Sequence, residues 1–251
     1  MSDLSNRVAL VTGASVGIGR AVALRLAEAG AFVGVHFNTS KTEAEETLAD
    51  IREAGSDGML LQADLANAEQ AMGLVSQLVN QTEQLDILVN NAGALLQRAT
   101  IEDCPLDFWE KSLAVNLTGA FLVTQKAIPY LKASGNGAII NNLSLSVQTG
   151  GANGAGPYAI AKGGLQVMTR TLARELTPKV RTNAIMPGVI ETRHHEQFTS
   201  PERMAEYEKE TPMDRNGQPD EVASTVLFLA SDAARFVNGA LLDINGGRFL
   251  R

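Results

Sequence analysis

Short apolar runs alternate with helical patterns along the whole chain, and no proline- or serine-rich linker interrupts them. We predict strands over residues 7–12, 32–37, 58–62, 86–90, 137–143, 180–186 and 239–244. We predict helices between them, over residues 17–29, 41–54, 67–83, 107–133, 157–177 and 219–231. Because strand–helix–strand units close into right-handed crossovers, this alternation predicts a single α/β domain spanning 1–251. Its core is a doubly wound, seven-stranded parallel sheet with helices on both faces.

The first predicted strand leads into a glycine-rich turn and then into a helix. Residues 12–19 read TGASVGIG, with glycines in the spacing Gly-x-x-x-Gly-x-Gly. Glycines let a backbone approach a pyrophosphate closely, and the unpaired N–H groups of a first helical turn point at such an anion. We therefore predict a nucleotide site here. A turn that merely links a strand to a helix is the alternative.

Residues with useful chemistry follow several predicted strands, where parallel sheets bind their ligands. These residues are Gly13, Asn38, Asp64, Asn91, Ser144 and Pro187. The irregular stretch 188–218 follows the sixth strand, and we expect it to form a lid or part of a substrate pocket. Arg193, His194 and His195 in this stretch, together with Arg98, are candidate contacts for an acidic or sugar-acid substrate.

Tyr158 and Lys162 are four residues apart in a predicted helix, which places both side chains on one helix face. A free phenol has a pKa near ~10 and transfers protons poorly at neutral pH. A nearby ammonium group favours the phenolate, so we expect Lys162 to lower the pKa of Tyr158 into a range useful for general acid–base chemistry. A half-buried tyrosine beside a solvated lysine is the alternative for this pair alone.

Composition argues against several classes of partner. The formal net charge is −7 and no basic stripe is present, which disfavours nucleic acid and anionic membranes. The single cysteine, Cys104, cannot form an internal disulfide and fits a reducing compartment. No signal-peptide pattern and no apolar span of about 18 residues is present, so we expect a cytoplasmic protein. Adjacent His194 and His195 point in different directions, and we predict no metal site.

Seen together, the motifs resemble those of the compact short-chain dehydrogenase/reductases, over essentially the whole chain. The matching pieces are 12–19, 90–93, Asn116, Ser144, Tyr158 with Lys162, 187–188, 238–239 and 246–247. The surrounding sequence is similar to 3-oxoacyl-thioester reductases and to sugar and sugar-acid reductases. The resemblance implies a Rossmann-like fold and an NAD(P)H-dependent oxidoreductase that interconverts a ketone or aldehyde and an alcohol.

The resemblance also implies roles for individual residues. Tyr158 would be the general acid or base, and Lys162 would lower its pKa and bind the nicotinamide ribose. Ser144 would hold the substrate oxygen, and Asn116 would bind a water that links Lys162 to solvent. Residues expected to contact the cofactor are Gly13, Ser15, Val16, Gly17, Ile18, Gly19, Asn38, Thr39, Ser40, Asp64, Leu65, Asn91, Ala92, Gly93, Tyr158, Lys162, Pro187, Gly188, Ile190 and Thr192. Those expected to contact the substrate are Ser144, Ser146, Tyr158 and Arg193.

The serine departs from the family pattern. Ser144 precedes Tyr158 by fourteen residues, whereas Leu145 fills the commonest family position, at thirteen. Leucine cannot donate a hydrogen bond to an oxyanion, so either the loop carries one extra residue or Ser146 takes the role. The glycines of residues 149–156 can absorb an insertion. We favour Ser144, with Ser146 as the second choice.

Cofactor preference is predicted from the end of the second strand. NAD-specific sites usually place a carboxylate there, but residues 35–41 read VHFNTSK and contain none. Asn38, Thr39, Ser40 and Lys41 suit a 2′-phosphate, which favours NADP(H), although Val16 stands where many NADP-using relatives have a basic residue and NAD(H) stays possible. A non-catalytic NAD(P)-sensing protein is the alternative function. From the resemblance we expect a homotetramer.

Overall fold

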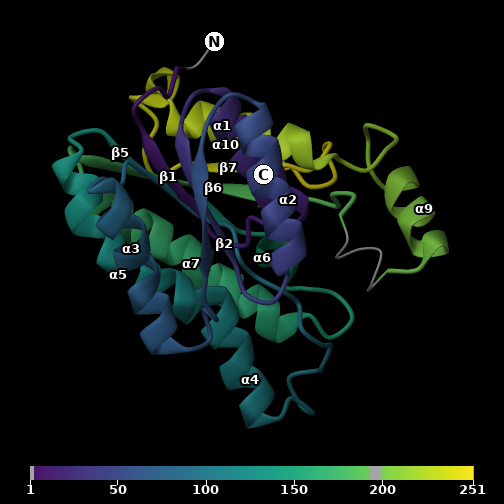
Figure 1. Ribbon diagram of the computed structural model, residues 1–251. Coiled ribbons are helices and arrows are strands. Elements are labelled where there is room, and N and C mark those ends of the chain that lie inside the picture. The colour runs from purple at the N-terminus through teal and green to yellow at the C-terminus, as the bar shows by residue number, and fades with distance from the viewer. Residues whose placement is uncertain (1–2, 193–198, 251) are drawn as a thin grey trace.

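The computed structural model describes residues 3–192 and 199–250, which contain a seven-stranded, all-parallel sheet (Figure 1). The strand order is β3-β2-β1-β4-β5-β6-β7. The strands are β1 Val8–Val11, β2 Phe32–Phe37, β3 Gly58–Gln62, β4 Ile87–Asn90, β5 Gly137–Asn142, β6 Val180–Pro187 and β7 Leu241–Ile244. The strand order changes direction between β1 and β4, which is the switch point of a doubly wound sheet. The predicted fold class is confirmed.

Helices cover both faces of the sheet (Figure 1). One face packs against α1 (Gly17–Glu28), α2 (Lys41–Glu53) and α10 (Pro219–Ala230). The other face packs against α3 (Ala68–Thr82), α5 (Gly119–Ala133) and α7 (Gly156–Glu175). No helix within 3–192 or 199–250 has both the length and the apolar character needed to cross a membrane.

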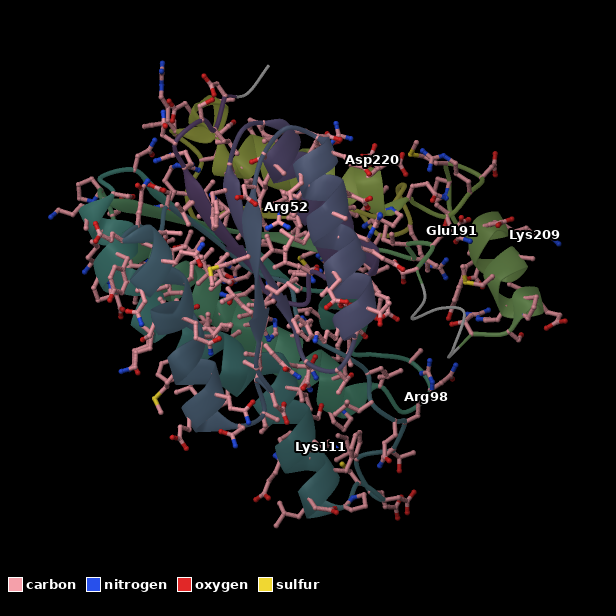
Figure 2. The ribbon with its side chains drawn as sticks, viewed as in Figure 1. Arg52, Arg98, Lys111, Glu191, Lys209 and Asp220 are labelled. Atoms are coloured by element: carbon pink, nitrogen blue, oxygen red, sulfur yellow. The ribbon has the colours of Figure 1, made fainter. Side chains whose placement is uncertain are left out.

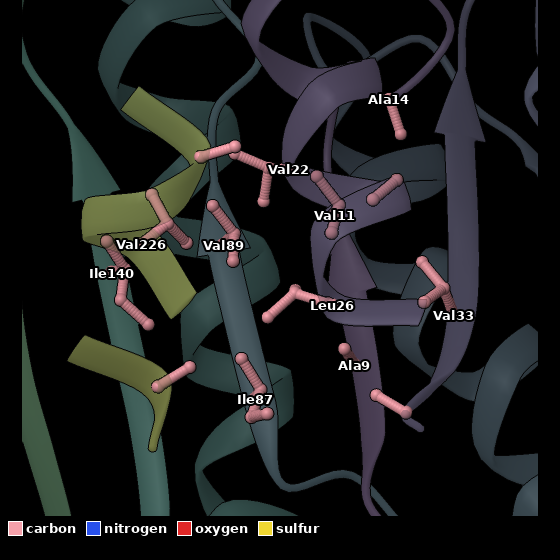
Figure 3. Packing of buried hydrophobic residues seen from close by; sticks show 14 of the residues in the cluster. Ala9, Val11, Ala14, Val22, Leu26, Val33, Ile87, Val89, Ile140 and Val226 are labelled. Atoms are coloured by element: carbon pink, nitrogen blue, oxygen red, sulfur yellow. The ribbon is translucent and has the colours of Figure 1, made fainter. Parts of the chain in front are cut away.

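The strands are mostly apolar because both faces of the sheet are covered. Ala9 and Val11 of β1 belong to the core beneath α1 and α10, whereas Val8 and Leu10 belong to the core beneath α3 and α5. Figure 3 shows the first core, in which Leu26 packs among residues of β1 and β4. Each fully buried aliphatic side chain contributes about 1.5–3 kcal/mol. Two such cores hold the carboxyl ends of the strands in a fixed arrangement.

The predicted helix 107–133 is divided into three elements. It consists of α4 (Leu106–Leu113), a π-helical segment η1 (Ala114–Thr118) and α5. Asn116 lies in the π segment, where its Nδ2 donates to the Ser112 carbonyl at 3.0 Å. Single π turns inside α-helices are frequent at functional sites. Sequence periodicity did not show this interruption, since a π turn adds one residue without changing which residue types are apolar.

The stretch predicted to be irregular, 188–218, contains the helix α9 (Pro201–Lys209). Ser200 is its N-cap and accepts a hydrogen bond from the Arg203 amide at 3.3 Å, and Pro201 occupies the first turn. Serine followed by proline is a helix-start signal that the sequence prediction overlooked. The short elements α6 (Ser146–Thr149) and η2 (Asp232–Ala234) were also not predicted, and β7 begins two residues later than expected.

Candidate active site

A cavity of about 750 Å³ lies beside the carboxyl ends of the strands. Every residue that the resemblance assigns to the cofactor and that is named above lines this cavity, and so do Ser144 and Ser146. Most of these residues lie in the segments that follow the strands β1 to β6, and Tyr158 and Lys162 lie on α7. The structure therefore brings the predicted set together. What the set binds stays a prediction.

Three glycines shape the turn between β1 and α1. Gly13 and Gly17 have φ values of +64° and +56°, which favour glycine. At Gly19, a Cβ atom would lie 2.0 Å from the Gly13 carbonyl oxygen and 2.5 Å from Asn91 Nδ2. The N-cap residue of α1 is Val16, and no side chain there caps the first amides. This cradle of bare backbone at a helix N-terminus fits the pyrophosphate of a dinucleotide.

Asn91, after β4, holds the glycine turn from one side. Its Nδ2 donates to the carbonyl oxygens of Thr12 at 2.9 Å and Gly13 at 3.1 Å. Thr12 Oγ1 in turn accepts hydrogen bonds from the amides of Asn91 and Ala92 at 2.9 and 3.0 Å. Asn142 Nδ2 donates to Asn91 Oδ1 at 2.9 Å, which links β5 to the same turn. The side-chain amide of Asn91 therefore holds the glycine-rich turn in place.

Tyr158 and Lys162 both lie on α7, as the spacing predicts. Lys162 is 2 % exposed, its Nζ donates to the Asn142 carbonyl at 2.7 Å, and it lies 5.9 Å from the centroid of the Tyr158 ring. Burial lowers the pKa of Lys162 to about 8. Burial also raises the pKa of the Tyr158 phenol, although a hydrogen bond with Ser144 acts in the opposite direction.

The direction for Tyr158 is opposite to the lowered pKa predicted from the sequence. The ammonium of Lys162 bonds to the Asn142 carbonyl rather than to the phenol, so removal of the phenol from water dominates. A raised pKa keeps Tyr158 protonated at neutral pH.

Asn116 lies behind the wall of the cavity. Its Oδ1 accepts from the Ala94 amide and its Nδ2 donates to the Ala94 carbonyl, both at 2.9 Å. At Gly93, a Cβ atom would lie 2.7 Å from Asn116 Oδ1 and 2.9 Å from Lys162 Nζ. Because glycine has no Cβ atom, the side chains of Asn116 and Lys162 can both lie against the backbone of residue 93. The π segment therefore places Asn116 next to the buried ammonium group.

The two candidate serines have different surroundings. Ser144 hydrogen-bonds to Tyr158, and its Oγ accepts from the Ser146 amide at 3.2 Å. Among the described residues, Ser146 Oγ is buried and has no hydrogen-bond partner. Gly150 and Gly151 follow with φ of +78° and +77°, so the loop accommodates its extra length. Proximity to Tyr158 favours Ser144 over Ser146.

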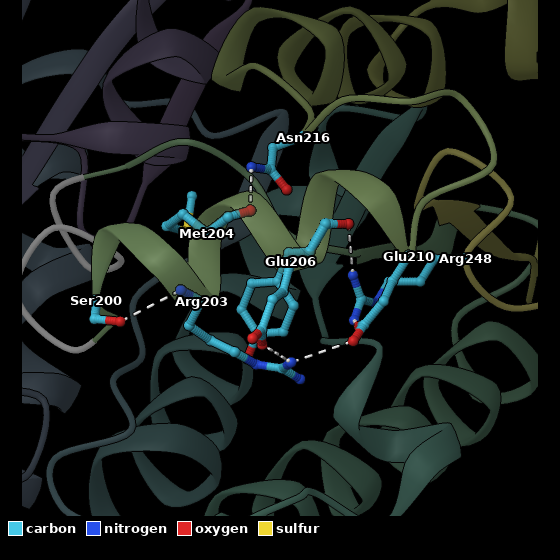
Figure 4. A network of polar contacts seen from close by, with 8 residues as sticks. Ser200, Arg203, Met204, Glu206, Glu210, Asn216 and Arg248 are labelled. Atoms are coloured by element: carbon cyan, nitrogen blue, oxygen red, sulfur yellow. Dashed lines mark hydrogen bonds and ion pairs between the residues drawn. The ribbon is translucent and has the colours of Figure 1, made fainter.

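Helix α9 contributes Arg203 and Tyr207 to the cavity lining, and a stacked cluster joins this helix to the C-terminal segment (Figure 4). The guanidinium groups of Arg203 and Arg248 lie 4.3 and 4.6 Å from the centroid of the Tyr207 ring. Arg203 pairs with Glu206 at 2.6 Å and with Glu210 at 3.2 Å. Arg248 pairs with Glu210 and donates to the Tyr207 carbonyl at 3.0 Å.

The predicted substrate contacts are only partly described. Arg193, His194 and His195 lie outside the described residues. Arg98 lines the cavity and donates to the carbonyls of Ala152 and Asn153 at 3.2 and 3.1 Å. Figure 2 shows Arg98 on the side of the molecule from which α9 projects. Across 3–192 and 199–250, no group of three or more His, Cys, Asp and Glu side chains is placed to hold a metal ion.

Several residues that line the cavity were not predicted from the sequence, among them His36, Arg203, Tyr207 and Arg248. The start signal at Ser200 and Pro201 predicts a helix that would carry Arg203 and Tyr207. For His36 and Arg248 the sequence gives no such signal, because their partners are distant in the chain.

Comparison with known proteins agrees with this geometry. A family model described as enoyl-(acyl carrier protein) reductase matches residues 13–248. The 3-oxoacyl-[acyl-carrier-protein] reductase of Staphylococcus aureus is 38% identical over 247 residues, which are 96% of this chain and 98% of that protein.

Two solved structures superpose closely on this fold. A short-chain dehydrogenase/reductase of the glucose/ribitol dehydrogenase type from Brucella melitensis has a TM-score of 0.91 and 32% identity, over 100% of this chain and 99% of that one. An NADH-dependent reductase named A1-R′, responsible for alginate metabolism, has a TM-score of 0.91 and 33% identity over the full length of both chains. By sequence, fold and cavity together, this chain belongs to the short-chain dehydrogenase/reductase family of oxidoreductases.

Proposed function

We propose that this chain interconverts a ketone or aldehyde and the corresponding alcohol with a nicotinamide dinucleotide, using Tyr158 as the general acid or base. One observation carries the proposal: Ser144, Tyr158 and Lys162 lie in the same cavity as a glycine cradle that fits a pyrophosphate. When bound, the nicotinamide supplies or accepts the hydride. The protein residues supply binding, orientation and the proton.

In the reducing direction, the Tyr158 hydroxyl donates its proton to the carbonyl oxygen of the substrate. Ser144 Oγ bonds to the same oxygen and stabilises the negative charge that develops on it. The ammonium group of Lys162 keeps a positive charge beside this site. Both Lys162 Nζ and Asn116 Oδ1 lie close to Gly93. Positioned acid catalysis of this kind typically accelerates a reaction about 10²–10⁴-fold.

The proposed cofactor preference is NADP(H), with NAD(H) as the alternative. Asn38, Thr39 and Ser40 line the cavity at the end of β2, and residues 35–41 contain no carboxylate. Asp64, after the neighbouring strand β3, lines the same cavity. Lys41, at the start of α2, lies 3.7 Å from the carboxylate of exposed Glu45. A preference for NADPH below about tenfold in kcat/KM, or roughly 1.4 kcal/mol, would show that this polar cluster does not discriminate.

The proposed substrates are ketoacyl thioesters and keto sugars or sugar acids. The relatives named above include a 3-oxoacyl-[acyl-carrier-protein] reductase and a reductase responsible for alginate metabolism. Arg203 and Arg248 reach the cavity but are each paired with a glutamate, so their cluster carries no net charge. The stacked cluster alone therefore favours neither substrate class.

The test is consumption of NADPH or NADH, followed at 340 nm, with a panel of ketones, ketoacyl thioesters and keto sugar acids. We expect turnover with one class and a loss of about 10²–10⁴-fold in kcat for Tyr158→Phe, while the dissociation constant of the dinucleotide is unchanged. Binding without turnover across the panel would favour the sensing protein instead. Undiminished turnover by Tyr158→Phe would refute the assigned proton donor.

We also propose a homotetramer in the cytoplasm. Phe121 on α5 and Ile160 and Val167 on α7 are 45%, 47% and 62% exposed, and apolar residues in such positions suit an interface between subunits. Sedimentation at micromolar concentration tests the assembly. A mass near that of one chain would count against it.

A further inference from the structure

His36 on β2 is a buried histidine that uses both of its ring nitrogens. His36 is only 2 % exposed. The Gly13 amide donates to Nδ1 at 2.9 Å, and Nε2 lies 3.0 Å from the Ala63 carbonyl oxygen. An amide can only donate and a carbonyl can only accept, so Nδ1 is unprotonated and Nε2 carries the hydrogen. The two contacts select one tautomer of the neutral ring.

The surroundings keep this ring neutral. Burial lowers the pKa of His36 to about 4, and the bond to the Ala63 carbonyl offsets only part of that shift. At neutral pH, Nδ1 is therefore always available as an acceptor. The Ala63 carbonyl fixes the orientation of the ring, and the orientation in turn directs Nδ1 at Gly13.

This bond holds the glycine turn on the side opposite to Asn91. Asn91 binds the carbonyl oxygens of Thr12 and Gly13, whereas His36 binds the Gly13 amide. The His36 carbonyl also accepts from the Ala14 amide at 2.8 Å. The N–H of Gly13 is consequently directed at the histidine and is not free to bind a phosphate. This N–H contributes to the cradle by fixing the position of the glycine-rich turn.

The position of Gly13 governs the rest of the cradle. The Gly13 carbonyl lies so near Gly19 that even a methyl group there would collide with it. A small shift of the turn would therefore move the first amides of α1 relative to the cavity. Loss of the bond to His36 would also leave the Gly13 amide without its acceptor, and buried unpaired amides are costly.

We propose that His36 is a positioning residue for the pyrophosphate site: its Nδ1 accepts the Gly13 amide and so sets the glycine-rich turn for the dinucleotide. This inference rests on the proposed function, since it assumes that the cradle binds a nicotinamide dinucleotide. It concerns affinity for the pyrophosphate-bearing half and not proton transfer. His36 is not a catalytic residue in this proposal.

Two substitutions separate the two ring contacts. His36→Asn places an amide oxygen near the position of Nδ1 and retains an acceptor for Gly13. His36→Gln places an amide nitrogen near the position of Nε2 and retains the donor to Ala63, but loses the acceptor. Calorimetry gives the dissociation constants of the dinucleotide and of ADP-ribose, and steady-state kinetics gives kcat and the KM of the carbonyl substrate.

We expect His36→Gln to weaken both ligands by about tenfold, which corresponds to about 1.4 kcal/mol, and His36→Asn to stay within about threefold of the wild type. The carbonyl KM and kcat at saturating dinucleotide should change little in either variant. Ile87→Val, in the core beneath α1 and α10 and outside the cavity lining, controls for a general loss of stability and should leave both dissociation constants unchanged.

Equal losses in the two His36 variants, or a larger loss in His36→Asn, would overturn the inference while leaving the proposed function intact. Unchanged affinity in both variants would also overturn it. A wild-type chain that binds neither the dinucleotide nor ADP-ribose would overturn the proposed function and this inference together. Near-wild-type affinity in His36→Asn together with weakened binding in His36→Gln would support the assigned contact.

Discussion

Acid should destabilise this protein through His36, and the size of the effect follows from its burial. The pKa of His36 falls from its ordinary value of 6.5 to about 4 in the folded chain. Between these values the unfolded chain binds a proton that the folded chain does not, so the unfolding free energy decreases as the pH falls. The full shift is worth about 3 kcal/mol, of which about 2 kcal/mol develops between pH 7 and pH 4.5.

The measurement is urea unfolding at a series of pH values, for the wild type and for His36→Asn. Asparagine does not titrate, and the other ionisable groups contribute almost equally to both proteins. The difference between the two unfolding free energies should therefore shift by about 2 kcal/mol in favour of the variant between pH 7 and pH 4.5. A difference that stays constant over this range would show that His36 is not held neutral by burial, and the reasoning would fail.

Three further predictions test the site. Gly19→Ala should weaken dinucleotide binding by at least about a hundredfold, because its Cβ would lie 2.0 Å from the Gly13 carbonyl oxygen, whereas Gly73→Ala on α3, with open space around it, should bind normally. Retained binding by Gly19→Ala would contradict the close approach. Ser144→Ala should lower kcat by about 10²–10³-fold and Ser146→Ala should lower it much less, and the reverse order in initial-rate measurements would exchange their roles. Arg248→Ala removes a stacking contact and an ion pair that together stabilise the position of α9 by about 1 kcal/mol. Protease cleavage within 199–210 should therefore become about fivefold faster, and the KM of the carbonyl substrate should rise. Exposed Arg235→Ala is the matched control, and equal cleavage rates in the two variants would rule out this anchoring.

The sequence determined the architecture because the necessary information is local. Continuous apolar runs such as 7–12 indicate strands covered on both faces, and the glycines of residues 12–19 are required by backbone geometry within a few residues of themselves. The i, i+4 spacing placed Tyr158 and Lys162 together on α7. The loops after the strands were correctly predicted to meet, since parallel strands end at one edge of the sheet.

Only the tertiary structure decided the electrostatics of the site. The direction of the Tyr158 pKa depends on how much water surrounds the phenol and on the bond from Lys162 to the Asn142 carbonyl, and neither is encoded in a spacing of four. Likewise, His36 on β2 accepts a hydrogen bond from the Gly13 amide after β1, and Arg248 near the C-terminus stacks on the Tyr207 ring of α9. Burial and hydrogen bonding between distant segments arise only when the layers pack. The local pattern therefore predicts many of the residues that line the cavity, but not their protonation states or their hydrogen-bond partners.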